Sequence, residues 1–199
     1  MDFDEYRDET ELIIRQNNVE CALYPLIYRV IRSQPCMRRF SVMDTTILQK
    51  QKSGANAGAF ALRMYEYEKG GKTVNGAADY LIADREFTYN DNTRDKIYGC
   101  IEVKALNMNP LRNIGHNAQF RAELDTFGKL IVTTGLIWRF YDSGRADRYY
   151  PVWECVLGKY NFKDDSNSKN KHISCEDTVE WAEGQWETLE QSLIAVKWN

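Results

Sequence analysis

The sequence predicts an α/β fold in which helices flank a central mixed sheet of four to five strands. Two observations carry this prediction: strand-like apolar segments are mixed with segments of helical periodicity, and one of these strands is nearly all apolar, as expected of a central strand covered on both faces. A length of 199 residues, with 43% hydrophobic and 28% charged residues, is typical of one globular unit with a full core. We therefore expect residues 1–199 to form a single domain.

The first third of the chain predicts a long helix followed by less regular segments. Apolar residues recur at helical spacing over residues 9–33, where Pro25 either kinks the helix or marks a junction between two helices. Residues 42–47 contain a β-branched run, an uncertain strand. Residues 60–67 fit a strand or a helix equally well, and residues 69–72 predict a turn.

The middle of the chain gives a firmer pattern. Residues 77–87 and 96–106 read as two strands joined by a polar hairpin loop. The second of these is nearly all apolar until Glu102, as expected of a central strand covered on both faces. Residues 117–127 follow with helical spacing.

The last third predicts strands, then a loop and a helix. Residues 129–135 form a buried strand that ends at a glycine, residues 136–142 a second strand and residues 149–156 another. Residues 159–171 are rich in Asn, Asp, Ser and Lys, which favours a loop. Residues 175–197 predict a C-terminal helix.

Charged residues at the end of an apolar strand mark a candidate functional site, because charge is costly to bury unless it is paired or bound to a metal. Asp79 follows a short apolar stretch, and Glu102-Val103-Lys104 ends the central strand. Side chains alternate along a strand, so Glu102 and Lys104 should point to one face. The carboxylates of Asp79 and Glu102, with the Val103 carbonyl, could hold Mg²⁺, or Mn²⁺ in its place, and so activate a water.

Lys104 would then orient that water or offset negative charge on a phosphate, a role we prefer to that of general base. The plain alternative is that Glu102 and Lys104 form an exposed ion pair worth about 0–1 kcal/mol. The position after an apolar strand, with an aspartate one hairpin upstream, favours the functional interpretation.

Composition narrows the remaining classes of function. The formal net charge is −3, which argues mildly against sequence-independent binding to nucleic acid. No apolar run approaches the roughly 20 residues of a membrane span, and the acidic N-terminus is unlike a secretory signal, so we expect a cytoplasmic protein without membrane contact. The five scattered cysteines form no C-x-x-C pair, which argues against zinc and predicts reduced, mostly buried thiols.

Asp79, Glu102 and Lys104, in their predicted strands, resemble the motif of the PD-(D/E)xK nuclease superfamily, which has a restriction-endonuclease-like fold. The chain is most similar to the N-terminal nuclease domain of type I restriction enzyme R subunits. Asp79 matches the aspartate that opens the motif, and Glu102 and Lys104 match its E-x-K. Gln119 resembles the glutamine of the Q-x-x-x-Y motif, which contacts nucleic acid or supports the site in relatives.

The resemblance also implies a glutamate from the first helix at the metal. Glu20 is our choice and Glu11 is the alternative. The resemblance covers roughly residues 9–142, which would form the nuclease core, and leaves residues 149–197 as an elaboration. No phosphate-binding loop of a helicase motor is present in the sequence.

Three positions depart from the family pattern. Ala78 stands at the usual proline, Thr134 where relatives often have asparagine, and Glu123 where the Q-x-x-x-Y motif has tyrosine. The departures at Thr134 and Glu123 weaken the assignment of Gln119 more than they weaken that of the catalytic residues.

The activity that the resemblance implies is Mg²⁺-dependent cleavage of phosphodiester bonds, with DNA favoured over RNA and a phage or bacterial defence setting. A homodimer would suit double-strand cleavage. A catalytically inactive nuclease fold that grips a protein or nucleic acid is the main alternative. The other alternative is a structural protein with an interaction surface formed by Trp138, Tyr149, Tyr150 and Trp153. Aromatic residues in this pattern, however, more often belong to the core.

Overall fold

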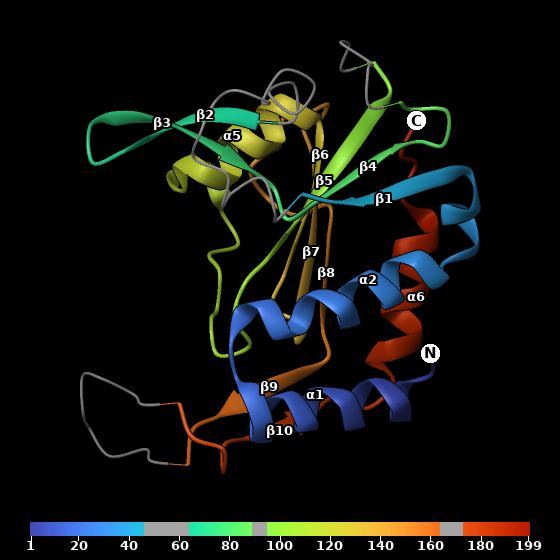
Figure 1. Cartoon of the computed structure of the whole chain (residues 1–199), viewed down its shortest axis with the longest axis vertical. Coiled ribbons are helices and arrows are strands. Elements are labelled where there is room, and N and C mark those ends of the chain that lie inside the picture. The colour runs from blue at the N-terminus through green and yellow to red at the C-terminus, as the bar shows by residue number, and fades with distance from the viewer. Residues whose placement is uncertain (46–63, 89–94, 164–172) are drawn as a thin grey trace.

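A six-stranded mixed sheet forms the centre of the computed structural model, which describes residues 1–45, 64–88, 95–163 and 173–199 (Figure 1). The strand order is β1-β4-β5-β6-β7-β8, with β5 and β6 parallel and every other neighbouring pair antiparallel. The predicted α/β class is confirmed, but the prediction of four to five strands is wrong, because β1 and β8 extend the sheet at both edges. The helices and strands are α1 (Phe3–Asn17), η1 (Glu20–Leu23), α2 (Tyr24–Ser33), η2 (Pro35–Arg39), β1 (Phe40–Asp44), β2 (Met64–Lys69), β3 (Lys72–Ala77), β4 (Tyr80–Asp84), β5 (Ile97–Val103), η3 (Ile114–His116), α5 (Ala118–Phe127), β6 (Lys129–Thr133), β7 (Ile137–Asp142), β8 (Trp153–Val156), β9 (Gly158–Asn161), β10 (Thr178–Trp181) and α6 (Gln185–Ala195).

Two layers cover the two faces of this sheet. One core packs α1, α2 and α6 against it, and a second core packs α5 against the opposite face, with the β2–β3 hairpin lying beside α5 (Figure 1). The central strand β5 contributes to both: Ile101 and Val103 belong to the first core and Cys100 to the second. The nearly continuous apolar run of β5 is thus explained by its burial on both faces.

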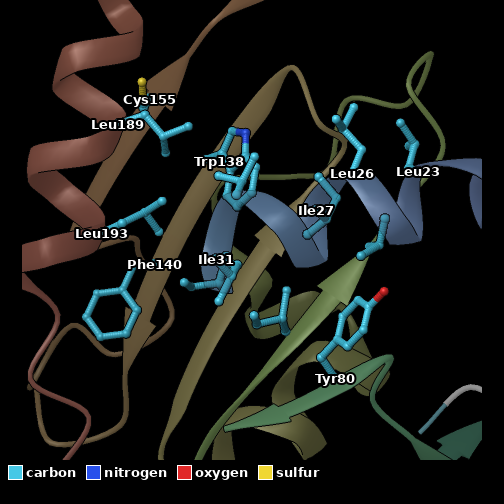
Figure 2. Packing of buried hydrophobic residues seen from close by; sticks show 14 of the residues in the cluster. Leu23, Leu26, Ile27, Ile31, Tyr80, Trp138, Phe140, Cys155, Leu189 and Leu193 are labelled. Atoms are coloured by element: carbon cyan, nitrogen blue, oxygen red, sulfur yellow. The ribbon is translucent and has the colours of Figure 1, made fainter. Parts of the chain in front are cut away.

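Figure 2 shows the larger core at close range. Leu189 and Leu193 of α6 and Ile31 of α2 are directed at Trp138 and Phe140 of the sheet. Trp138 is fully buried, and its indole N–H donates to the carbonyl of Gly135 at 2.9 Å. The Trp138 ring is therefore core, whereas Tyr150, from the same proposed aromatic surface, is 52% exposed.

The N-terminal segment forms two helices rather than one. α1 begins at Phe3, well before the predicted residue 9, because the Asp2 carboxylate caps it by accepting a hydrogen bond from the Glu5 amide at 2.9 Å. A 3₁₀ turn separates α1 from α2, and Pro25 lies in the first turn of α2, where its missing N–H costs nothing. The junction that Pro25 was expected to mark is confirmed.

The β2–β3 hairpin closes on Gly70 and Gly71, both with positive φ, as the twist of a two-residue hairpin turn requires. The predicted turn at residues 69–72 is therefore confirmed. Of the ambiguous segment 60–67, the described part is strand, and residues 60–63 lie outside the described residues. The strand β3 was not predicted.

The C-terminal third differs most from its prediction. Residues 159–161, expected in a polar loop, belong to β9, and residues 178–181, expected in a helix, form β10 and pair with it. The buried carboxylate of Asp177 explains this, because it accepts hydrogen bonds from the Tyr160 hydroxyl and from two backbone amides on either side of the segment 164–172, which is outside the described residues. The helix α6 begins only at Gln185.

Two further expectations concern solvent and membrane exposure. In the described ranges, no helix combines the length and apolar character that a membrane crossing needs. All five cysteines are free thiols; Cys100 and Cys155 are buried, Cys36 is half-buried, and Cys21 and Cys175 are exposed. The expectation of mostly buried thiols is thus wrong for the last two.

Candidate active site

Asp79 and Glu102 converge at one end of the sheet. Asp79 directly precedes β4, and Glu102 is the penultimate residue of β5, which pairs with β4 in antiparallel register. Both side chains are buried, at 2% exposure each. The backbone amide of Val103 donates to Asp79 Oδ2 at 2.7 Å, so the end of β5 fixes the aspartate directly.

Glu102, in β5, and Lys104, which directly follows this strand, point to the same side, as the alternation of strand side chains predicts. Lys104 Nζ lies 2.5 Å from Glu102 Oε1, and the pair is largely buried rather than exposed. The same Oε1 accepts a hydrogen bond from Gln119 Nε2, also at 2.5 Å. Gln119 lies in the first turn of α5, whose start is fixed by the Asn117 side chain accepting from the Phe120 amide.

Glu123 is one of two site residues that the sequence reasoning missed. It is completely buried, and its Oε1 accepts a second hydrogen bond from Gln119 Nε2 at 3.0 Å. Gln119 therefore bridges the carboxylates of Glu102 and Glu123. The signal was available, because a residue four positions after Gln119 lies on the same helix face, where Glu123 had been noted only as a departure from the family pattern.

The N-terminal half of the chain supplies Tyr24 and Glu20. The Tyr24 hydroxyl donates to Asp79 Oδ1 at 3.1 Å and lies 3.3 Å from Glu20 Oε1. Glu11, the alternative to Glu20, lies on α1 and accepts a hydrogen bond from the indole of Trp181 at 3.0 Å. The Tyr24 hydroxyl therefore links Glu20, and not Glu11, to Asp79. Tyr24 had not been predicted to take part.

Burial and crowding of like charges raise the pKa values of the two central carboxyls. Burial, followed by the nearby charge of Glu102, raises the pKa of Asp79 to about 7. Burial, followed by the charge of Glu123, raises the pKa of Glu102 well above its usual value, and the Lys104 ammonium only partly opposes this. Near neutral pH and without a bound cation, the carboxyl groups of Asp79 and Glu102 are therefore readily protonated.

Lys104 and Tyr24 keep their protons. Burial acts to lower the pKa of Lys104, but the combined charges of Glu102, Glu20 and Glu123 outweigh it, and the net pKa is raised. Burial and then the charges of Asp79 and Glu20 raise the pKa of Tyr24. Lys104 is therefore an ammonium cation and Tyr24 a hydrogen-bond donor at physiological pH.

A hard divalent cation fits this donor set. All the candidate ligand atoms are oxygens, which Mg²⁺ prefers, and Glu102 Oε2 is buried without a hydrogen-bond partner among the described residues. Within the described part of the chain, no three His, Cys, Asp or Glu side chains are grouped closely enough to hold a metal by themselves. Mg²⁺ is usually bound through one or two carboxylates with several waters, so a pair of carboxylates suffices.

Comparisons with known proteins give no family for this chain: no family model, no curated protein and no solved structure matches it.

Proposed function

We propose that this chain is a divalent-metal-dependent nuclease of the PD-(D/E)xK type. It would hydrolyse phosphodiester bonds in nucleic acid, with DNA as the favoured substrate. The observation that carries the proposal is the convergence of the buried carboxylates of Asp79 and Glu102 with the Lys104 ammonium. Buried carboxyl groups with raised pKa values, such as these two, are candidates for functional sites. A restriction-endonuclease-like core is part of the proposal, supported by the mixed sheet in which β4 and β5 are neighbours.

Asp79 and Glu102 would hold Mg²⁺, or Mn²⁺ in its place, with the Val103 carbonyl and the Glu20 carboxylate as further oxygen donors. When bound, the ion would activate an attacking water and offset negative charge on the phosphate. It would also balance the crowded negative charge: after burial, the charge of Glu102 raises the pKa of Asp79 and the charge of Glu123 raises the pKa of Glu102.

Lys104 contributes a fixed positive charge. The Glu102 carboxylate holds its ammonium at 2.5 Å, and the raised pKa keeps it protonated, so it stabilises charge on the phosphate or orients the water rather than acting as the base. The resemblance allows two roles for Gln119, contact with nucleic acid or support of the site, and we assign it the second. Its amide nitrogen contacts two carboxylates, and this orients Glu102 instead of reaching for nucleic acid.

The test is cleavage of labelled single- and double-stranded DNA and of RNA by the purified protein, with Mg²⁺, with Mn²⁺ and with EDTA. Asp79→Asn and Glu102→Gln should reduce cleavage to background, and Lys104→Met should slow it by about 100-fold or more. Glu11→Gln is the matched control, because Glu11 is a helix carboxylate that contacts Trp181 rather than Asp79. It should cleave at the wild-type rate.

If Asp79→Asn and Glu102→Gln still cleave after contaminating nucleases are excluded, these two residues do not form the active site. Binding of nucleic acid without cleavage in any of the metals would instead favour the inactive binding module. Light scattering of the protein with and without DNA tests the homodimer that double-strand cleavage would favour.

A further inference from the structure

Tyr24 lies between two carboxylates that come from different segments. Its hydroxyl oxygen is 3.1 Å from Asp79 Oδ1 and 3.3 Å from Glu20 Oε1. A phenolic hydroxyl has one proton, so it can donate to only one of the two at any moment. Glu20 belongs to η1, Tyr24 opens α2 and Asp79 precedes β4, so this single hydroxyl links the start of α2 to the sheet.

The backbone of Tyr24 is held in place by the residue that follows Asp79. The hydroxyl of Tyr80 donates to the Tyr24 carbonyl at 2.8 Å, and the two rings meet edge to face, with centroids 6.2 Å apart. Residues 79 and 80 thus bind both the main chain and the side chain of Tyr24. Because two contacts converge from one dipeptide, the position of the Tyr24 hydroxyl relative to Asp79 is fixed by the fold.

Asp79 is oriented from both sides as a result. Val103 donates to Oδ2 from β5, at 2.7 Å, while Tyr24 donates to Oδ1 from α2. Hydrogen bonds to the two oxygens of one carboxylate fix the plane in which it meets a ligand. In metal sites, outer hydrogen bonds of this kind orient the ligands, and their removal typically weakens metal binding or activity by about 10–100-fold.

We propose that Tyr24 is a positioning residue for the divalent cation: its hydroxyl, which donates to one carboxylate at a time, orients Asp79 and sets where Glu20 lies relative to it. This inference rests on the proposed function and adds a residue to its site. Tyr24 touches neither the phosphate nor the water in this scheme. It acts through the two carboxylates that it contacts.

The experiment is titration of Mn²⁺ by calorimetry into the wild type and into Tyr24→Phe, with Asp79→Asn identifying the heat that belongs to this site. Phe keeps the ring contact with Tyr80 and loses only the hydroxyl. We expect about 10–100-fold weaker Mn²⁺ binding. The Mg²⁺ concentration for half-maximal cleavage should rise by a similar factor, with kcat at saturating Mg²⁺ changed little.

Tyr28→Phe is the matched control. Tyr28 lies one helical turn further along α2, packs with its ring centroid 6.2 Å from Tyr80 and is 38% exposed. Its substitution should leave Mn²⁺ affinity within about twofold of the wild type, since surface changes of this kind are near neutral. Urea unfolding of both variants shows whether each is folded at the temperature of the titration.

A second variant separates the two contacts and remains informative if Tyr24→Phe does not fold. Glu20→Gln should weaken Mn²⁺ binding on its own, and the loss caused by Tyr24→Phe should be smaller when Glu20→Gln is already present, because both act on one ion. Unchanged affinity in Glu20→Gln would overturn the inference for Glu20.

Wild-type Mn²⁺ affinity in folded Tyr24→Phe, together with metal-dependent cleavage, would overturn the inference and leave the proposed function standing. A wild-type protein that neither binds Mn²⁺ at this site nor cleaves would overturn both.

Discussion

Replacement of Asp79 by asparagine should stabilise the metal-free protein at pH 8. Asparagine has the same shape, its carbonyl can accept the hydrogen bond from the Val103 amide, and its amide can donate to the Tyr24 oxygen. The substitution removes only a charge that is buried beside Glu102. The wild type should therefore be less stable than the variant at any pH at which the unfolded chain ionises Asp79.

The magnitude follows from the pKa of Asp79, which is about 7 in the folded chain against an ordinary value of 3.8. The folded state keeps a proton that the unfolded state releases, so the free energy of unfolding falls as pH rises through this interval and levels off above about pH 7. One pKa unit corresponds to ~1.4 kcal/mol, which sets an upper bound of about 4 kcal/mol. We expect Asp79→Asn to be more stable by ~1–4 kcal/mol at pH 8, with a difference less than half as large at pH 5, because the unfolded chain begins to release this proton near its ordinary pKa of 3.8.

The assay is urea unfolding in EDTA at pH 5 to 9, followed by the same series with Mg²⁺. A cation bound to the folded state stabilises by mass action, so Mg²⁺ should raise the unfolding free energy of the wild type but not that of Asp79→Asn. Asp177→Asn is the control. Asp177 is also a buried aspartate, but three hydrogen bonds hold its pKa below the usual value, although burial acts to raise it. Its substitution should destabilise at pH 8.

The reasoning would be refuted by an Asp79→Asn variant that is less stable than wild type at pH 8 in EDTA. A difference between the two proteins that does not change from pH 5 to pH 8 would refute it as well.

Three further predictions concern the scaffold, and urea unfolding at pH 7 measures the first two. Leu124→Ala should lose about 2–5 kcal/mol, because Leu124 is fully buried between α5 and the sheet. Asn117→Ala should lose about 1 kcal/mol, since it removes the side-chain cap of the helix that carries Gln119. Gly99→Ala should cost ~1–3 kcal/mol and shift the tryptophan fluorescence, because a Cβ there would lie 2.5 Å from the Trp198 ring. An unchanged emission spectrum with wild-type stability would contradict the third, and full stability in either of the others would contradict the packing or capping described for it.

Local patterns in the sequence predicted the elements around the site, although both strands are shorter than expected. The helix expected at residues 117–127 is α5, with Asn117 as its cap, and the two strands of the central hairpin are β4 and β5. Strand alternation alone placed Glu102 and Lys104 on one face, where they form an ion pair. These features depend on short-range periodicity, which a single sequence displays directly.

The tertiary structure decided the features that depend on distant residues. The hairpin of β9 and β10 lies in a polar stretch without strand periodicity, and a buried Asp177 holds its flanking segments together. The edge strand β1 pairs with β4, about 40 residues further along the chain, whereas the other edge strand, β8, pairs with β7, which directly precedes it among the strands. Nothing in the local pattern of β1 specifies that it will pair with β4.

The candidate site divides in the same way. The sequence by itself singled out Asp79, Glu102 and Lys104 as candidates for holding a metal and a phosphate, because their residue types and spacing are local properties, and the family resemblance added Gln119. Only the packing of α2 against β4 brought Tyr24 to Asp79, and only the packing of α5 on the sheet buried Glu123. Burial and the proximity of like charges, which raise the carboxyl pKa values, exist only once those layers have assembled.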